Sequence, residues 1–368
     1  MELFAPDGAK LTDVTGGICR VPLGYCRREL NSAAFNGLER LTYVNLDTET
    51  ENASDEYATR LTAACGGDFV SAAYTSSGVG ALRGAAAAAM EYYSASGRGD
   101  SGRILVLDMS SHAAELSDMN ITLLRAPYFL SDTHEERVGL LADIEHCFAA
   151  HDIAAVIIEP VSASVGLRTL PQWYQKELFA AIRAENALII ADERLTGFGR
   201  TGKPFAYTEL TETPDILCLS DAATNGMLPV GILLTGKRAA DVCVPHAINP
   251  LVCQIGCEAL KLYSRLCVSD AINRIGAAFE AMLEAECVGE IRRTGMMLCV
   301  ELEDECGAPL SVEKLTELRG KLFSQGYAVM LYCVPDTASG LMLMPSYIMT
   351  KKSAAEIASA IGGSLRGI

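Results

Sequence analysis

The chain has 368 residues, of which 50% are hydrophobic, and its formal net charge is −16. A chain of this length can bury a large core, either in two or three domain-sized units or in one large domain with a satellite. The acidic balance argues against nucleic acid and anionic membranes as partners. The longest apolar runs are only long enough for strands, so no membrane span is expected. The N-terminus has no signal-peptide pattern, and we therefore predict a cytoplasmic protein.

Short β-rich segments alternate with helical patterns up to about residue 255. The β-rich segments are 103–109, 154–160, 187–193, 215–220 and 230–236, and helical patterns include 80–95 and 171–186. Continuous apolar strands between helices are typical of a parallel sheet with both faces covered. The pattern therefore predicts an α/β fold with a mostly parallel central sheet.

The rhythm changes in the last third of the chain. One long helical pattern covers 257–286, and it is followed by strands at 296–304, 328–332 and 340–345, a helix at 311–325 and a final helix. Strands and helices in this order predict a separate, smaller α+β unit at the C-terminal end.

Acidic residues stand at or near the ends of the predicted strands, namely Asp108, Glu159, Asp192, Glu193 and Asp221. The carboxyl ends of the strands form the binding edge of an open α/β sheet. A carboxylate there can hold a protonated ring nitrogen or act as an acid or base. For any one of these residues taken alone, capping of the next helix or turn is the simpler explanation.

The thirteen cysteines lie mostly in apolar stretches, as expected of small buried hydrophobes in a reducing compartment. Cys243, His246, Cys253 and Cys257 alone have spacing that suggests metal ligands. A helix face of small residues explains Cys253 and Cys257 equally well, and no paired CxxC motif is present. We therefore expect no metal site.

The string ADERLTGFGRTGKPFAY at 191–207, together with TPDILCLS at 213–220, AAVIIEPV at 154–161 and NPLVC at 249–253, resembles the class III (subgroup II) pyridoxal-phosphate aminotransferases. Within them it looks closest to the adenosylmethionine-8-amino-7-oxononanoate aminotransferase branch of biotin synthesis. The resemblance implies fold type I, with a large domain at 41–255 and a small domain built from a truncated 1–40 and from 256–368. It also implies a homodimer with its sites at the subunit interface.

Half of the cofactor site matches this family. The resemblance assigns Asp192 to the aspartate that pairs with the pyridinium nitrogen of pyridoxal phosphate, which makes the ring an electron sink. His112 and Glu159 also match. Ser77 and Gly78 remain from the phosphate turn, where backbone amides at a helix N-terminus bind an anion. The scaffold residues Gly197, Gly199, Arg200 and Asn249 are kept as well.

The other half of the site departs from the family. Asp221 stands where the resemblance expects the Schiff-base lysine, and a carboxylate cannot form an imine. Other departures are Val79 for a phosphate-binding hydroxyl, Arg83 for an acidic residue, Ser111 for the stacking aromatic and Pro245 for a threonine from the partner subunit. The arginine for the substrate carboxylate has no counterpart.

These departures favour a degenerate family member without transaminase activity, acting as a structural or regulatory subunit. We expect it to form a homodimer, or a heterodimer with an active paralogue, and to bind pyridoxal phosphate without a covalent bond if it binds it at all. One alternative is an enzyme that reuses the fold, with Asp192, Glu159, His112 and Asp221 in new roles. The other is an aminotransferase related to 7,8-diaminopelargonate synthesis whose imine-forming lysine comes from elsewhere, although Lys203 and Lys237 are poorly placed.

Overall fold

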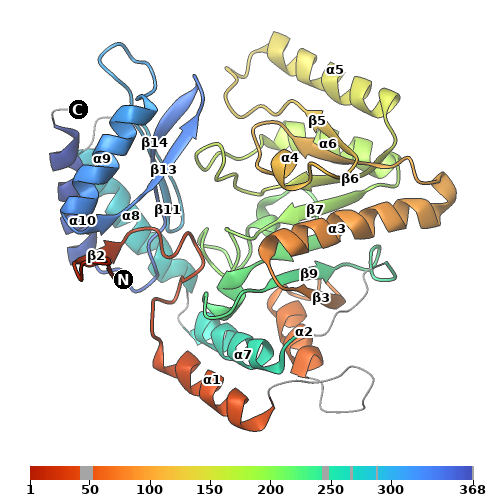
Figure 1. The fold of residues 1–368 in the computed structure, drawn as a ribbon. Helices are drawn as coiled ribbons and strands as arrows, with labels where there is room; N and C mark the ends of the chain where they lie inside the picture. The colour runs from red at the N-terminus through yellow and green to blue at the C-terminus, as the bar shows by residue number, and fades with distance from the viewer. Residues whose placement is uncertain (42–52, 243–247, 266–267, 287–288, 367–368) are drawn as a thin grey trace.

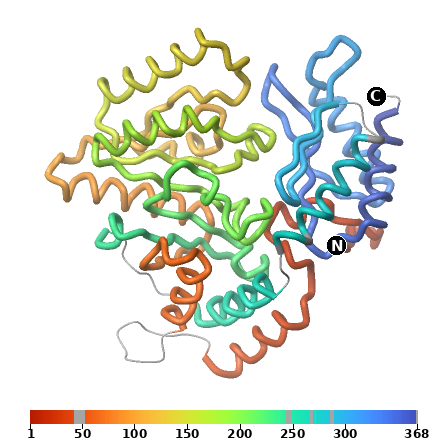
Figure 2. Tube along the Cα trace, turned by 180° about the vertical axis from the view of Figure 1, so that it is seen from behind, coloured from red at the N-terminus to blue at the C-terminus, as the bar shows by residue number. Residues whose placement is uncertain are grey.

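The computed structural model describes residues 1–41, 53–242, 248–265, 268–286 and 289–366 (Figure 1). Its strands form one seven-stranded, one four-stranded and one three-stranded sheet. The seven-stranded sheet and its helices make the larger part of the molecule, and the other two sheets lie beside it (Figures 1 and 2). The predicted α/β fold, with a mostly parallel central sheet and a smaller α+β part, is confirmed.

The seven-stranded sheet has the order β3 (Ser71–Thr75), β9 (Gly231–Thr235), β8 (Ile216–Leu219), β7 (Leu188–Asp192), β6 (Ile153–Ile158), β4 (Arg103–Leu107) and β5 (Ile121–Leu124). Only β9 runs antiparallel to its neighbours, and the remaining pairs are parallel. Strands β6 to β9 are buried along their whole length, which accounts for their continuous apolar sequences. The sequence did not predict β3 and β5, because neither has such an apolar run.

Helices cover both faces of this sheet (Figure 1): α3 (Gly78–Tyr93), α4 (His112–Glu115), α5 (His134–Ala150) and α6 (Gln172–Ala184). Alternate residues of β4 point to opposite faces, as the strand period requires. Ile104 and Val106 pack with the alanine-rich α3, whereas Leu105 and Leu107 pack with α5 and α6. Packing on both faces thus fixes the register of the strands, and with it which residues reach the carboxyl edge of the sheet.

The predicted single helical stretch over 257–286 is wrong. The structure has α7 (Pro250–Arg265) and α8 (Val268–Glu286) in two different places. Helix α7 packs on α1 (Arg28–Arg40) and α2 (Ala53–Ala64), whereas α8 packs on α10 (Lys351–Leu365) (Figure 1). The apolar faces of α7 and α8 belong to separate hydrophobic cores, a separation that helical periodicity alone does not reveal.

The smaller part combines both ends of the chain. Its four-stranded antiparallel sheet has the order β10 (Ile291–Thr294), β11 (Met297–Glu301), β14 (Ala338–Leu343) and β13 (Met330–Val334), with α9 (Val312–Ser324) nearby. The three-stranded sheet joins β1 (Glu2–Phe4) and β2 (Lys10–Asp13) to β12 (Tyr327–Ala328). The division of the chain at 40 and 255 stays a prediction. None of the helices in the described ranges is both long and apolar enough to cross a bilayer.

Two arginine networks connect the parts of the molecule. The fully buried Arg200 donates to the carbonyl oxygens of Met344 and Pro345 and to that of Cys19, so it connects its own loop with both ends of the chain. Glu301 on β11 accepts hydrogen bonds from Arg292 on β10 and from Arg168 in the loop after β6. The second network therefore links the small sheet to the large one.

Candidate functional site

A cavity of about 320 Å³ opens at the carboxyl edge of the seven-stranded sheet. Segments that follow β3, β4, β6, β7 and β8 supply most of its lining, as expected for a binding site in an open α/β sheet. Five of the residues predicted from the sequence line it: Ser77, Gly78, Glu159, Asp192 and Asp221. The sixth, His112, is buried directly beside Asp192. The fold thus brings together residues that are far apart in the sequence.

The end of β7 aims Asp192 at the cavity and turns Glu193 away from it. Glu193 is buried and accepts hydrogen bonds from the backbone N–H groups of Ala206 and Tyr207, which hold the short helix η2 (Ala206–Glu209). Burial raises the pKa of Glu193 to about 7. Asp108, another strand-end carboxylate, accepts the N–H of Ala126 just after β5. Glu193 and Asp108 are therefore structural, and neither lines the cavity.

His112, Asp192 and Glu159 form a buried cluster at the bottom of the site. The Nε2 atom of His112 lies 3.0 Å from Asp192 Oδ2 and 3.9 Å from Glu159 Oε1. Burial opposes protonation of His112, but the two carboxylates outweigh it and raise the pKa of His112. Burial raises the pKa of Glu159, whose carboxylate accepts the hydroxyl of Ser162. His112 therefore orients Asp192 from behind.

Arg194, which the sequence analysis did not single out, covers the front of Asp192. Its Nε lies 2.9 Å from Asp192 Oδ1 and 3.0 Å from Oδ2, and its Nη2 lies 2.8 Å from Oδ2. The backbone N–H of Arg194 also donates to Asp192 Oδ1 over 3.0 Å. Burial alone would raise the pKa of Asp192, but Arg194 and His112 hold it well below its usual range. Both oxygens of Asp192 are thus already hydrogen-bonded.

Glu115, at the end of α4, holds the other side of the Arg194 guanidinium. Its Oε2 lies 2.7 Å from Arg194 Nη1, and its Oε1 accepts the hydroxyl of Ser111 over 2.8 Å. Arg83 donates to the backbone carbonyl of Glu115 over 3.0 Å and pairs with Asp118. Ser111 and Arg83, which the resemblance gives as departures from its pattern, therefore both contact Glu115.

Asp221 opens the short helix η3 (Asp221–Thr224) after β8, and its carboxylate is engaged on both sides. Its Oδ1 accepts the N–H of Val230 over 3.0 Å, and its Oδ2 lies 3.1 Å from Arg20 Nε. The first contact closes the loop between β8 and β9. The second ties this loop to the segment between β2 and α1. Asp221 therefore has structural partners at the position where the resemblance expects a lysine.

The chain that carries Arg20 to the cavity has an unusual backbone. Residues 16–19 all have positive φ angles, between 55° and 63°. Two of the four are not glycine, so the turn is costly for the backbone and needs support from its surroundings. Asp13 supplies it, because its carboxylate accepts the N–H of Gly17 and the hydroxyl of Tyr25. Arg20 is thus held at the mouth of the cavity.

The turn between β3 and α3 forms another wall. Ser77 caps α3, because its Oγ accepts the N–H of Gly80 over 3.0 Å. A Cβ atom at Gly78 would lie 2.5 Å from Ser220 Oγ, which explains why this position has no side chain. Val79 is 43% exposed and adds an apolar group to the lining.

Within the described ranges, no lysine lines the cavity. Lys203 is exposed and pairs with Glu209 over 3.2 Å, and Lys237 follows the opposite end of β9 from the site. Pro245 lies outside the described residues. The cations that do line the cavity are Arg20 and Arg194, and a guanidinium does not form the imine that lysine forms.

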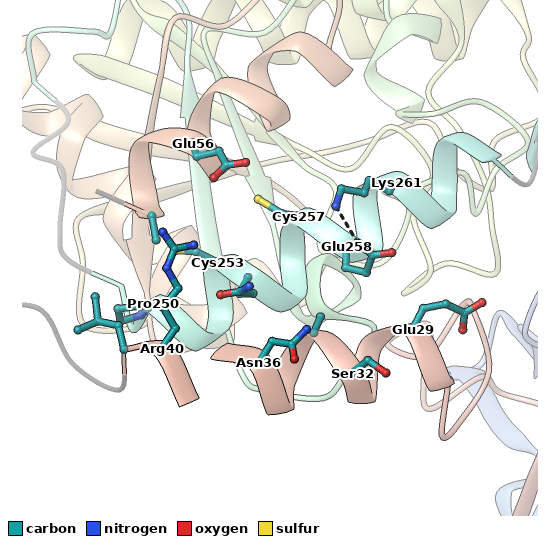
Figure 3. A pocket seen from close by; sticks show the side chains of 14 residues that line it. Glu29, Ser32, Asn36, Arg40, Glu56, Pro250, Cys253, Cys257, Glu258 and Lys261 are labelled. Atoms are coloured by element: carbon teal, nitrogen blue, oxygen red, sulfur yellow. Dashed lines mark hydrogen bonds and ion pairs between the residues drawn. The ribbon is translucent and has the colours of Figure 1, made fainter. Parts of the chain in front are cut away.

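Two groups of residues have side chains of the kinds that bind metals. His112, Glu159 and Asp192 lie close enough to share an ion, but the guanidinium of Arg194 already binds the oxygens of Asp192. Cys253 and Cys257 line a separate cavity of about 680 Å³ between α1, α2 and α7 (Figure 3). Cys243 and His246 lie outside the described residues, and no third ligand joins the two cysteines among the residues that are described.

Sequence reasoning missed Arg20, Glu115 and Arg194. Arg194 stands two residues after Asp192 in the string used for the resemblance, so its proximity to Asp192 was the available signal. Glu115 and Arg20 gave no such signal. The first reaches the cavity from a four-residue helix and the second from a turn with positive φ angles, and neither feature has a regular sequence pattern.

Comparisons with known proteins agree with this architecture. The family description "Aminotransferase class-III" matches residues 109–365. The omega-aminotransferase of Caulobacter vibrioides is 25% identical, over 94% of this chain and 87% of its own length. The adenosylmethionine-8-amino-7-oxononanoate aminotransferase of Staphylococcus aureus is 31% identical, over 51% of this chain and 46% of its own.

A solved (S)-enantioselective omega-transaminase from Thermomicrobium roseum superposes with a TM-score of 0.87 at 25% identity, covering 99% of this chain and 90% of its own. This likeness agrees with fold type I. The cofactor of the class-III family is pyridoxal phosphate, and a solved Pseudomonas omega-transaminase of the same fold holds its amine form, PMP. Because the family match covers more than half of the residues, the chain belongs to the class-III aminotransferases.

Proposed function

We propose that this protein is a class-III aminotransferase family member without transaminase activity, acting as a structural or regulatory subunit. One observation carries the proposal: Asp221, at the position where the family resemblance expects the imine-forming lysine, is bound to Arg20 and to the N–H of Val230. In transamination the lysine is both the covalent anchor and the group that moves the proton. A carboxylate that is engaged on both sides takes neither role.

The residues present do not fit pyridoxal phosphate. A ring nitrogen would need a free oxygen on Asp192, but Arg194 and His112 take both. The stacking position carries Ser111, whose hydroxyl is bonded to Glu115. Val79 stands where the resemblance expects a hydroxyl that donates to the phosphate. The ring, its nitrogen and its phosphate therefore each lack a partner that the resemblance leads one to expect.

We also propose that the carboxyl edge of the sheet is covered by a second subunit, either another copy or a paralogue. Exposed apolar side chains stand on loops and on the first turn of α3 at this edge: Ile18, Val79, Met109 and Met227 are 42%, 43%, 47% and 38% exposed. Apolar groups gathered in this way support an interface rather than a solvated surface. Light scattering at micromolar concentration is expected to give the mass of a dimer, and a monomer would contradict this part of the proposal.

The second candidate is a working aminotransferase whose lysine comes from a partner chain or a rearranged loop. It is favoured by the names of the relatives, one of which belongs to the branch for 8-amino-7-oxononanoate. An assay with added pyridoxal phosphate and several amino donors, including S-adenosylmethionine, separates the two candidates. We expect no product above the rate without protein. Multiple turnovers with any donor would establish the second candidate and exclude the first.

A further inference from the structure

We propose that Arg194 is an internal counter-ion for Asp192, which occupies the space in front of that carboxylate and excludes a cationic ligand from it. This inference deepens the proposed function and rests on it. Its basis is that every nitrogen of the guanidinium meets a carboxylate: Nε and Nη2 lie within 3.0 Å of Asp192 oxygens, and Nη1 lies 2.7 Å from Glu115. The Arg194 side chain is only 13% exposed.

The two-point geometry is specific to arginine. A planar guanidinium presents a fork of donors that matches a carboxylate, whereas an ammonium is a point charge. Asp192 is only 4% exposed at its side chain, so its charge needs a cation close by. The raised pKa of Arg194 and the lowered pKa of Asp192 both agree with a pair that stays ionised, although burial opposes the charge on each.

The position of Arg194 also closes the space between the sheet and α3. A Cβ atom at Gly78 would lie 3.1 Å from Arg194 Cδ, so the aliphatic part of the arginine runs along the start of this helix. The guanidinium then reaches across to Glu115 beyond β4. Arg194 and Asp192 both line the remaining cavity, and the guanidinium contacts both oxygens of Asp192 there.

Two of the departures from the family pattern support Arg194 through Glu115. Ser111 donates to one carboxylate oxygen of Glu115 over 2.8 Å, and Arg83 donates to its backbone carbonyl over 3.0 Å. Hydrogen bonds from two sides fix where Glu115 meets the guanidinium. Arg83, Ser111 and Arg194 thus belong to one connected network. This connection favours a set of coupled substitutions around an internal cation over unrelated losses at separate positions.

A double-mutant cycle in thermal unfolding tests this inference. Arg194→Ala leaves the buried Asp192 without its cation, and we expect it to lower Tm by about 4–8 °C. Asp192→Asn should cost clearly less stability in the Arg194→Ala background than in the wild-type background, because only the contact with His112 is then left to lose. Arg125→Ala is the matched control, because Arg125 pairs with Asp143 over 2.8 Å on the surface, and it should change Tm by about 2 °C or less.

Three results would overturn the inference. The first is an Arg194→Ala effect no larger than that of Arg125→Ala. The second is an Asp192→Asn effect that is the same in both backgrounds. The third is a rise in wild-type Tm with pyridoxamine phosphate that Asp192→Asn abolishes, because the carboxylate would then be open to a ring nitrogen.

If Arg194→Ala does not fold, Arg194→Lys takes its place in the cycle, because a lysine keeps the charge but loses the fork. Pyridoxamine phosphate is the right probe because, as an amine, it forms no imine with surface lysines. The proposed function fails separately, through turnover by the wild-type protein. That result is independent of whether Arg194 and Asp192 are coupled.

Discussion

Asp221→Lys is expected to show no turnover of amino donors above the wild-type background, even with excess pyridoxal phosphate. The new lysine would supply an amine, but Arg194 would still hold both oxygens of Asp192, so a protonated ring nitrogen would have no carboxylate to stabilise it. The change also removes the acceptor for the N–H of Val230 and places a second cation beside Arg20. The lysine position is therefore one of several obstacles.

The informative comparison is Asp221→Lys with Asp221→Lys/Arg194→Ala. Freeing Asp192 restores one charge-assisted hydrogen bond, worth about 1.5–3 kcal/mol, so the double variant should bind pyridoxal phosphate about 10- to 150-fold more tightly. Absorbance titration measures both affinities, and a product assay measures turnover. Sustained turnover by Asp221→Lys alone would mean that the lysine was the only missing part, and the proposed set of coupled substitutions would be wrong.

Glu301→Gln is expected to lower the free energy of unfolding by about 2–4 kcal/mol, because it leaves two half-buried arginines without their shared anion. Glu301 Oε1 lies 2.7 Å from Arg168 Nη1 and 2.5 Å from Arg292 Nη2, and its side chain is 12% exposed. Urea unfolding measures the loss. Glu317→Gln is the control, since Glu317 pairs with Lys321 on an exposed helix face and should contribute about 0.5 kcal/mol or less.

The same residue gives a pH dependence with a definite sign. Despite burial, which opposes its charge, Arg292 and Arg168 lower the pKa of Glu301 to about 2, from an ordinary value of 4.5. A lowered folded-state pKa stabilises the protein above pH 4.5, and this contribution is lost as the pH falls from 4.5 towards 2. Glu301→Gln should therefore have a shallower loss of stability over this interval. Parallel curves for the two proteins would show that the arginines do not act on Glu301.

Much of the large sheet was predictable because its strands have continuous apolar runs between helical patterns. Strand-end positions then placed Glu159, Asp192 and Asp221 at one edge, and the structure brings these three residues to one cavity. The prediction failed where local pattern and tertiary packing differ. The helical run after residue 257 is divided between α7 and α8 because its two halves bury their apolar faces in separate cores.

The contacts inside the site were less predictable than its location. The resemblance pairs Asp192 with the pyridinium nitrogen of a cofactor, whereas in the structure Asp192 contacts Arg194 and His112. Pairing between a strand-end carboxylate and a side chain two residues later depends on which rotamer the cavity allows, and sequence spacing does not determine this. Arg20 and Glu115 come from irregular segments, where no periodicity indicates the direction of a side chain.

The most direct test of the central claim is chemical trapping on the wild-type protein. The protein is incubated with pyridoxal phosphate, treated with borohydride and mapped by mass spectrometry, because reduction fixes any imine to the lysine that formed it. With Asp221 bound to Arg20, and no lysine among the described residues that line the cavity, we expect only scattered, substoichiometric labelling of surface lysines. Stoichiometric labelling of one lysine would contradict the account and identify the lysine that anchors the cofactor.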